Sequence, residues 1–350
     1  MARKSIPAPT DAEASPIESM EALLVDALPE GEGWQFEPKW DGFRCLAFKE
    51  AGRVRLFAKS GKALHRFFPE VAAAVAAIAA DDFVLDGELV IPMNDGPSFD
   101  ALQARLHPAE SRIRKLSAET PALLVVFDLL IAPGGKVLTQ QPLHARRSAL
   151  EKFFAAQSSP TLRLSPTTHD PKVARNWLSY AGSALDGVIA KRIADPYKSG
   201  ERAMLKVKNI RTADCVVGGF RYGEGTTVVA SLLLGLYDRQ GKLDHVGFTS
   251  ALAHEDKREL TARLEALRGE GFTGNAPGGP SRWSTERTGT YEALRPELVV
   301  EVSYDHVTGG RFRHGTGLKR WRPDKAPRQC TYDQLGLDAP PNPLIRETLD

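Results

Sequence analysis

Short apolar runs alternate with polar turns along most of this 350-residue chain. Between residues 34 and 208 the runs have the length and the β-branched content of strands. The strands predicted there span residues 42–48, 53–58, 83–91, 122–130, 187–193 and 204–207. Apolar residues at helical spacing predict helices at residues 16–28, 68–80, 99–105, 143–155 and 171–181. Helices at such irregular intervals favour an α+β fold over a doubly wound parallel sheet.

The pattern changes after residues 209–211, where strand candidates follow one another closely. Strands are predicted at residues 214–222, 228–238, 243–249, 298–304 and 317–321, with one helix at residues 253–270. Several short strands around one helix favour a small β-barrel, with the OB-fold as the leading candidate. We therefore expect a flexible N-terminal arm (1–16), a first domain (17–211), an OB-fold domain (212–332) and an extended C-terminal tail (333–350).

Composition mainly excludes other classes of protein. The longest Ala/Val/Ile-rich stretch, residues 71–80, is about half as long as the ~20 residues that a membrane-spanning helix needs. The N-terminus has basic residues without a following apolar segment, which argues against a secretory signal. Cys45, Cys215 and Cys330 lie far apart, as expected for buried thiols in a reducing cytoplasm.

The most informative stretch is residues 37–44, Glu-Pro-Lys-Trp-Asp-Gly-Phe-Arg, which contains the pattern K-x-D-G-x-R. Alone, it is also compatible with a β-turn at Asp41 and Gly42 between solvated charges. It is followed by further groups of charged residues, each beside a short apolar strand. These are KSGK (59–62), DGELV (86–90), VFDLL (126–130), DGVIAK (186–191), MLKVK (204–208) and RWRPDK (320–325).

This ordered series resembles the motif set of the covalent nucleotidyltransferases, and in detail that of the ATP-dependent DNA ligases. The resemblance runs from about residue 34 to residue 325. It is greatest to small bacterial ligases that have only two domains and to the ligase portion of bacterial end-joining ligases. It implies a nucleotidyltransferase (adenylation) domain of antiparallel sheets with flanking helices, followed by an OB-fold β-barrel. It also implies ATP as co-substrate, a divalent metal (Mg²⁺ or Mn²⁺) and nicked double-stranded DNA as substrate.

In such enzymes a lysine amine attacks the α-phosphate of ATP, which forms lysyl-AMP and releases pyrophosphate. AMP then passes to the 5′-phosphate of a nick, and the 3′-hydroxyl displaces it to seal the strand. The place of Lys39 in K-x-D-G-x-R implies that it is this nucleophile. A free lysine is protonated at neutral pH, so nearby cations or a metal must favour its neutral form. Arg44, Lys206 and Lys208 are the candidate cations.

The resemblance assigns further roles position by position. Glu37 is expected at the adenine amino group, Phe127 stacked on adenine, and Glu88 near the ribose and the metal. Asp186 is the expected metal ligand, together with Glu88. The other expected contacts to ATP are Arg44, Lys191, Arg202, Lys206, Lys208, Arg322, Asp324 and Lys325. The expected contacts to DNA phosphates are Arg44, Lys59 and Lys62.

Two positions depart from the family pattern. Asp186 stands where glutamate is usual, which shortens the reach by one methylene but keeps an oxygen ligand suited to Mg²⁺ or Mn²⁺. Lys59 stands where arginine is frequent and keeps the charge without the bidentate fork. Lys59 and Lys62 are also compatible with solvated turn charges, Phe127 with a core side chain, and Lys191 with a surface charge.

Three other functions stay open at this point. An RNA capping guanylyltransferase shares K-x-D-G-x-R and an OB domain, but it transfers GMP. An RNA ligase shares the first domain but usually lacks the barrel motif at residues 320–325. From a different class, the chain is compatible with a non-catalytic OB-type nucleic-acid-binding protein, which would need no covalently labelled lysine.

The nearly balanced charge, 46 Lys+Arg against 44 Asp+Glu, conceals local surfaces of one sign. Residues 39–70 carry eight basic and three acidic residues, whereas residues 1–37 carry two basic and eight acidic ones. A local basic surface predicts DNA affinity that falls steeply with salt. We expect a cytoplasmic, nucleoid-associated monomer without a membrane segment, acting in DNA repair or recombination with an end-binding repair protein as a possible partner.

Overall fold

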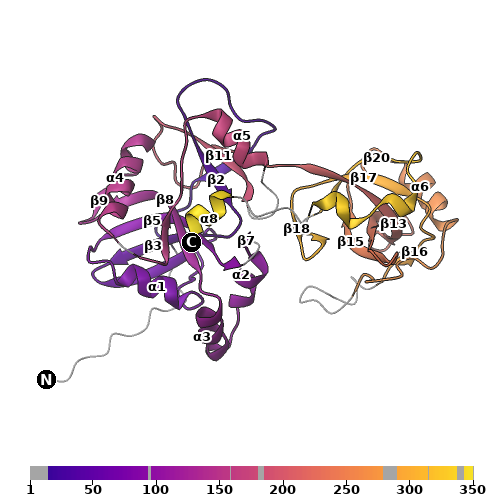
Figure 1. The fold of residues 1–350 in the computed structure, drawn as a ribbon, viewed down its shortest axis with the longest axis horizontal. Coiled ribbons are helices and arrows are strands. Elements are labelled where there is room, and N and C mark those ends of the chain that lie inside the picture. The colour runs from indigo at the N-terminus through magenta and orange to yellow at the C-terminus, as the bar shows by residue number, and fades with distance from the viewer. Residues whose placement is uncertain are drawn as a thin grey trace. The chain divides into compact units, whose positions relative to one another are not determined.

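The structure, a computed structural model, describes residues 15–93, 96–157, 159–179, 185–278, 290–313, 315–336 and 343–349. It divides into two compact units, Met1–Asn209 together with Pro340–Asp350, and Ile210–Ala339. Each unit has sheets and a core of its own (Figure 1). The first unit consists of two chain segments, so the chain passes between the units twice. The boundary that we expected after residue 211 lies two residues from this division.

Two sheets form the framework of the first unit, and most of their pairings are antiparallel. The four-stranded sheet has the order β1 (Glu21–Leu24), β12 (Arg202–Val207), β11 (Leu185–Arg192) and β2 (Trp34–Trp40). The six-stranded sheet has the order β10 (Leu162–Leu164), β8 (Leu123–Ala132), β5 (Phe83–Val90), β3 (Phe43–Glu50) and β4 (Arg53–Ala58), with β9 (Lys136–Val137) paired to β8. A separate two-stranded sheet joins β6 (Pro92–Met93) to β7 (Gly96–Pro97).

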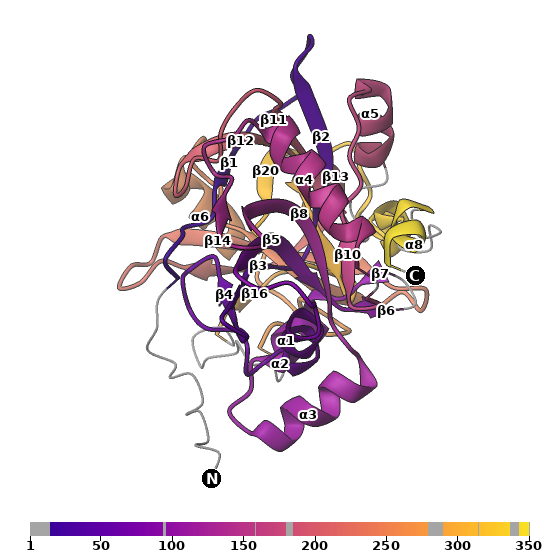
Figure 2. The ribbon, with the colours of Figure 1, turned by 90° about the vertical axis from the view of Figure 1, so that its left-hand side faces the viewer.

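Helices flank these sheets (Figure 2). They are α1 (Pro69–Ala76), α2 (Phe99–Arg105), α3 (Glu110–Glu119), α4 (Leu143–Ala155), α5 (Pro171–Ser179) and α8 (Pro343–Leu349). Strand β8 is buried on both of its faces. Leu124 and Val126 lie in the cluster that α1 and α4 cover, whereas Leu123 and Val125 lie in a second cluster with Trp40. Burial on both faces explains the nearly continuous apolar sequence of this strand.

A buried ion pair links helix α4 to strand β8. Arg146 donates from Nε and Nη2 to the two carboxylate oxygens of Asp128, at 2.9 and 3.0 Å. Its Nη1 donates to the carbonyl oxygens of Gln141 and Asp195. Both side chains of the pair are about 1% exposed, so each charge depends on the other for its solvation.

In the described part of the second unit, helix α6 accompanies an antiparallel sheet. The strand order is β15 (Leu243–Thr249), β14 (Val229–Tyr237), β13 (Arg211–Tyr222), β17 (Val299–Tyr304) and β20 (Gly317–Trp321), with β16 (Glu292–Ala293) also paired to β13. Helix α6 (Lys257–Glu265) begins at Asp256, whose carboxylate accepts hydrogen bonds from the backbone N–H groups of Arg258 and Glu259. A short hairpin pairs β18 (Val307–Thr308) with β19 (Arg311–Phe312).

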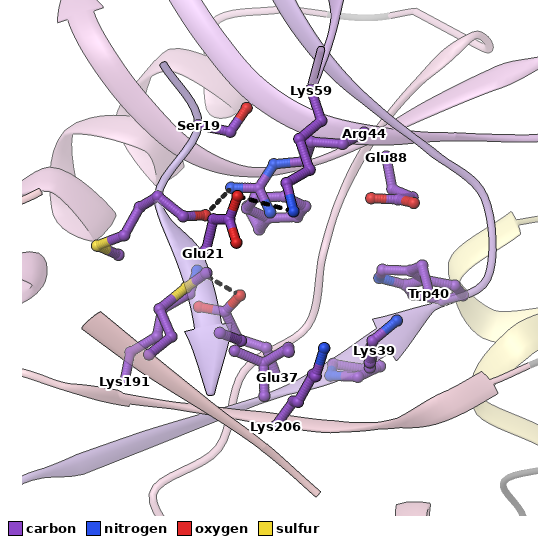
Figure 3. A pocket seen from close by; sticks show the side chains of 16 residues that line it. Ser19, Glu21, Glu37, Lys39, Trp40, Arg44, Lys59, Glu88, Lys191 and Lys206 are labelled. Atoms are coloured by element: carbon purple, nitrogen blue, oxygen red, sulfur yellow. Dashed lines mark hydrogen bonds and ion pairs between the residues drawn. The ribbon is translucent and has the colours of Figure 1, made fainter. Parts of the chain in front are cut away.

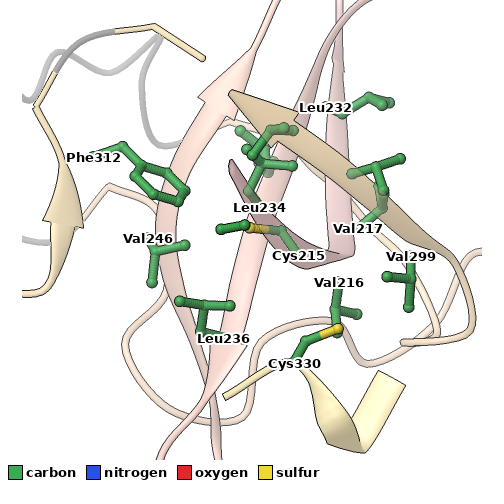
Figure 4. Close-up of a cluster of buried hydrophobic side chains, with 14 of the residues drawn as sticks. Cys215, Val216, Val217, Leu232, Leu234, Leu236, Val246, Val299, Phe312 and Cys330 are labelled. Atoms are coloured by element: carbon green, nitrogen blue, oxygen red, sulfur yellow. The ribbon is translucent and has the colours of Figure 1, made fainter. Parts of the chain in front are cut away.

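The inner faces of these strands form a single apolar core that includes Cys215, Leu234, Val246 and Phe312 (Figure 4). The antiparallel sheet agrees with the expected fold class, and the closed OB-fold barrel stays a prediction. All three cysteines are free and buried. Within the described part of the chain, no helix is both long and apolar enough to span a membrane.

The helix expected at residues 16–28 is wrong. Residues 21–24 form β1, which pairs in parallel with β12 at the edge of the four-stranded sheet. Hydrogen bonds from Glu21 N to Glu201 O and from Val25 N to Lys206 O extend the pairing. Met20 packs in the core beside Met204 and Tyr197. Sheet pairing and this packing override a helical periodicity that spans only a few turns.

The extended tail expected at residues 333–350 is also wrong for its described parts. Residues Tyr332–Leu335 form a 3₁₀ turn, and Pro343–Leu349 form helix α8. Ile345 and Leu349 of α8 are buried in the first unit, which supplies the apolar partners that a Pro-rich tail lacks by itself. Residues 1–14 of the expected flexible arm lie outside the described residues, as do residues 180–181 of the helix predicted at 171–181.

The Arg146–Asp128 pair leads to a stability prediction. Arg146→Ala leaves Asp128 buried without its counter-charge, so we expect a loss of about 3–5 kcal/mol in the free energy of unfolding. Arg114→Ala is the matched control, because its ion pair with Glu110 is exposed at both ends and contributes less than about 0.5 kcal/mol. Urea unfolding of both variants measures the difference, and equal losses would contradict the argument.

Candidate active site

A pocket in the first unit brings together eight of the residues that the sequence predicted (Figure 3). They are Glu37, Lys39, Arg44, Lys59, Glu88, Phe127, Lys191 and Lys206. Seven of them come from strands of both larger sheets, and Lys59 comes from the turn after β4, so the motif series is separated along the chain but converges in space. In Figure 3, Lys39 and Lys206 lie side by side at one end of the pocket, and the carboxylate of Glu37 turns toward Lys191.

Strand β2 aims three of its side chains into the same region. Gln35, Glu37 and Lys39 alternate along the strand and therefore share one face. Lys39 lies opposite Gly187 of β11. Gly187 has φ +140°, and a Cβ there would lie 2.0 Å from the carbonyl oxygen of Val207. Glycine is required at this position because β11 and the end of β12 approach so closely.

Three lysines are grouped near Asp186, and two of them pair with its carboxylate. The Lys39 Nζ lies 2.5 Å from Asp186 Oδ2, and the Lys208 Nζ lies 3.2 Å from Asp186 Oδ1. Burial alone would raise the pKa of Asp186, but Lys39 and Lys208 outweigh it and lower the pKa. Burial lowers the pKa of Lys206, and the positive charges of Lys39 and Lys208 lower it further. The excess of positive charge favours a polyanionic ligand.

Asp186 and Glu88 also fit a divalent metal. Both offer hard oxygen ligands, and Mg²⁺ is commonly bound by one or two carboxylates together with substrate phosphates and water. Among the described residues no group of three or more histidines, cysteines or carboxylates forms a complete protein cage. The arrangement therefore suits a metal that arrives with a phosphate ligand better than a structural metal.

The other end of the pocket is built around Glu37. Its Oε1 accepts a hydrogen bond from Gln35 Nε2 at 2.8 Å, and its Oε2 pairs with Lys191 Nζ at 2.7 Å. Lys191 Nζ also lies 4.7 Å from the ring centre of Phe127, and the guanidinium of Arg44 lies 4.5 Å from the same ring. This end joins an acceptor-only carboxylate to an aromatic surface.

Arg44 lies at the pocket but is held by a partner that the sequence did not identify. Its Nε and Nη2 donate to the two oxygens of Asp86, both at 2.6 Å. The hydroxyl of Tyr197 donates to the same carboxylate at 2.8 Å. Asp86 stands in the quoted DGELV motif, two positions before Glu88, but its role depends on the register of β3 against β5.

Glu21 is a second residue that sequence reasoning missed. It pairs with Lys59 at 2.8 Å and with Arg202 at 3.6 Å, so it joins a predicted DNA-phosphate contact to a predicted ATP contact. The hydrogen bond from Lys59 lowers the pKa of Glu21. Lys62 is exposed on the turn after β4 and does not line this pocket. The acidic residue was hidden within a segment that we predicted as a helix.

Three predicted nucleotide contacts belong to the second unit and are described within it. Arg322 Nη1 lies 2.8 Å from Asp214 Oδ1, and Lys325 Nζ lies 2.9 Å from Asp214 Oδ2. Arg322 also pairs with Asp324 at 2.8 Å. Asp214, at the centre of this group, was not identified from the sequence because it belongs to β13, far from the RWRPDK motif along the chain.

Comparisons with known proteins agree with this geometry. The family model described as "ATP dependent DNA ligase domain" matches residues 14–208, and the model described as "ATP dependent DNA ligase C terminal region" matches residues 225–325. DNA ligase C2 of Mycolicibacterium smegmatis is 41% identical over 344 residues, which covers 93% of this chain and 96% of that protein. The chain belongs to the ATP-dependent DNA ligases.

Two further similarities extend the comparison. The "Multifunctional non-homologous end joining protein LigD" of Pseudomonas aeruginosa is 32% identical over 333 residues, covering 92% of this chain but only 37% of that protein. A solved structure of a Lig E DNA ligase has a TM-score of 0.54 at 16% identity and covers 87% of this chain and all of that one, which shows a shared fold.

The chain is therefore an ATP-dependent DNA ligase that uses ATP and a divalent metal and acts on nicked DNA. The prediction of this family from the motif series is confirmed, as is the α+β fold class. Family membership sets aside the capping guanylyltransferase, the RNA ligase and the non-catalytic binding protein.

The environment of Glu88 leads to a pH prediction. Burial raises the pKa of Glu88 to about 7, against the opposing charges of Lys39 and Arg44. The folded state therefore holds this proton more tightly than the unfolded state, and the stability that the proton confers is lost as pH rises from about 4.5 to about 7. Glu88→Gln has no such proton to lose. Between pH 5 and pH 8 the free energy of unfolding of wild type should therefore fall by about 1–3 kcal/mol relative to that of the variant.

Urea unfolding of the nucleotide-free protein at several pH values measures this difference. Glu30→Gln, at an exposed carboxylate, serves as the control and should follow the wild-type curve. Wild-type and Glu88→Gln stabilities that stay parallel from pH 5 to pH 8 would refute the argument.

Proposed function

We propose that Lys39 is the nucleophile that attacks the α-phosphate of ATP and carries AMP as lysyl-AMP. The observation that supports this most directly is the contact of Lys39 Nζ with Asp186 at 2.5 Å, beside Lys206 and Lys208. The neighbouring positive charges attract the triphosphate of ATP to the attacking amine. A divalent metal held by Asp186 and Glu88 would supply further positive charge against the phosphate oxygens.

The two ends of the pocket suit the two ends of the nucleotide. Lys39, Lys206 and Lys208 face the phosphates, whereas Glu37 and Phe127 offer a carboxylate and an aromatic ring to the base. The Glu37 carboxylate accepts from Lys191 Nζ and offers only hydrogen-bond acceptors to the base. It therefore favours the amino group of adenine over the carbonyl oxygen of guanine at the same ring position. Glu88 and Arg44 are the proposed contacts to the ribose.

The later steps use the same lysine as an AMP carrier. AMP passes from Lys39 to the 5′-phosphate of a nick, and the 3′-hydroxyl then displaces it. Lys59, Lys62 and Arg44 are the proposed contacts to the DNA phosphates. In the second unit, Arg322, Asp324 and Lys325 are the proposed contacts to the pyrophosphate group during the first step. Arg202 is a further proposed contact to ATP, and it shares Glu21 with Lys59.

The biological setting proposed here is DNA repair or recombination. It is supported by the similarity to LigD, whose name describes a protein of non-homologous end joining. An end-binding repair protein is the corresponding partner, and the enzyme acts as a monomer in the cytoplasm at the nucleoid. Co-purification with nicked or broken DNA ends in cell extracts, with and without such a partner, tests this setting.

Covalent labelling tests the nucleophile. Incubation with α-labelled ATP and Mg²⁺ or Mn²⁺, followed by denaturation, should give acid-labile label on the protein. Lys39→Ala should lose the label completely and should not seal nicks, because the substitution removes the amine that attacks the α-phosphate. Lys115→Ala, on exposed helix α3, is the control and should be labelled at the wild-type rate.

Other labelling patterns would contradict the proposal in different ways. Label from GTP alone would support capping chemistry, and no label from either nucleotide would support a binding protein. Label that persists in Lys39→Ala would move the nucleophile to another residue.

The hydrogen bond from Gln35 to Glu37 leads to a prediction about the base. Gln35 is 2% exposed, and Gln35→Leu removes a donor to a charged acceptor, an interaction of about 1.5–3 kcal/mol. We expect the KM for ATP to rise about tenfold or more with kcat largely kept, and the preference for ATP over GTP to shrink. The exposed Gln140→Leu is the control. An unchanged ATP/GTP ratio in Gln35→Leu would show that this contact does not orient Glu37 for the base.

A further inference from the structure

Helix α8 returns to the first unit after the whole of the second unit has been built. The chain leaves the first unit at residue 209, and residues 340–350 belong to the first unit again. In Figures 1 and 2 the yellow helix lies against elements of the first unit that come from the indigo and magenta parts of the chain. A helix of seven residues is too short to be stable alone, so its docking surface must support it.

The docking surface of α8 is a closed apolar cluster. Ile345 and Leu349 are 4% and 5% exposed, and they belong to one buried cluster with Trp40, Val90, Leu123, Val125 and Leu185. The opposite side of the helix, at Arg346 and Glu347, is exposed. The helix therefore completes a core of the first unit and does not merely lie on its surface.

Two members of this cluster are direct neighbours of the proposed catalytic groups. Trp40 follows Lys39 on β2, and Leu185 precedes Asp186 on β11. Trp40 and Leu185 are also cross-strand partners, one step from the pair formed by Lys39 and Gly187. The packing of α8 therefore supports the ends of β2 and β11, where Lys39 and Asp186 lie within 2.5 Å of each other.

We propose that α8 is a positioning element for self-adenylation, with Ile345 and Leu349 as its positioning residues. By completing the buried cluster that contains Trp40 and Leu185, they hold the ends of β2 and β11 in the register that sets the distance between Lys39 and Asp186. The inference rests on the proposed role of Lys39. A displacement of about 1 Å at a reacting group costs on the order of 100-fold in rate, so even partial loss of this support should be measurable.

The predicted effect is specific to one step. Self-adenylation needs the Lys39 amine in attacking geometry, whereas sealing of a nick that already carries AMP on its 5′-phosphate does not use Lys39 as nucleophile. In the full chain, Ile345→Ser with Leu349→Ser should slow single-turnover lysyl-AMP formation at saturating ATP by about tenfold or more. Sealing of the pre-adenylated nick should change by less than about threefold.

Two controls separate positioning from general destabilisation. Glu347→Ala lies on the exposed side of the same helix and should keep both rates. Leu150→Ala lowers stability through a different core of the first unit and should leave the ratio of the two rates unchanged. If Leu150→Ala alters that ratio as much as the double variant does, the role of α8 is merely structural and the inference is wrong.

A truncated chain gives an independent test. A chain that ends at residue 336 should adenylate slowly, and a synthetic peptide of residues 337–350 should restore the rate in a concentration-dependent manner. Adenylation of the double variant and of the truncated chain at the wild-type rate would overturn the inference. That outcome is distinguishable from failure of the proposed function, in which wild type takes no label or Lys39→Ala still takes it.

Discussion

The ion pair between Lys39 and Asp186 is the contact on which the rest of the site depends. It is made across β2 and β11, and it requires that glycine stand opposite Lys39 at residue 187, where β11 approaches the end of β12. Lys208 binds the second oxygen of the same carboxylate. Without Asp186, these amines would repel one another in a partly buried pocket. With it, the ligand-free enzyme keeps a positive site assembled and ready for phosphates.

The same logic extends to the other charges of the first unit. Arg44 is held by Asp86, Glu37 by Lys191, and Arg146 by Asp128, each within 3.0 Å. Buried charges are tolerated because each has a partner of opposite sign and further hydrogen bonds. The pairs that line the pocket differ in one respect from Arg146–Asp128, because a nucleotide can offer them new partners. Arg146 and Asp128 lie on α4 and β8 and do not line the pocket, so a nucleotide bound there does not compete for either charge.

The sequence was sufficient to predict the family and most residues of the pocket. Most motifs lie on or beside strands whose apolar runs are visible, and β4, α2 and α4 have the bounds that were predicted. Strand β2, which carries Glu37 and Lys39, was not among the predicted strands. The segments that were missed depend on contacts far away in the chain. Strand β1 is fixed by pairing with β12, helix α8 by a core in the first unit, and the polar helix α3 buries only Ile113. Local periodicity carries little information about such segments.

The partners of the catalytic groups were missed for a related reason. The roles of Gln35, Glu21 and Asp214 depend on the side chains that they bind. The folded structure, and not the local sequence, determines which side chains these are. Gln35 could have been suspected, because it shares the alternating face of β2 with Glu37 and Lys39. Glu21 and Asp214 carried no such signal. The sequence shows which residues have the chemistry, but it does not show which charges are already paired before ATP arrives.

The most direct test of this account is to locate AMP among the three clustered amines. Protein incubated with ATP and Mg²⁺ is digested under conditions that preserve phosphoramidates, and the peptides are analysed by mass spectrometry. The account predicts AMP on the peptide that contains Lys39 and on no other. AMP on Lys206 or Lys208, or no adduct on any lysine, would contradict it.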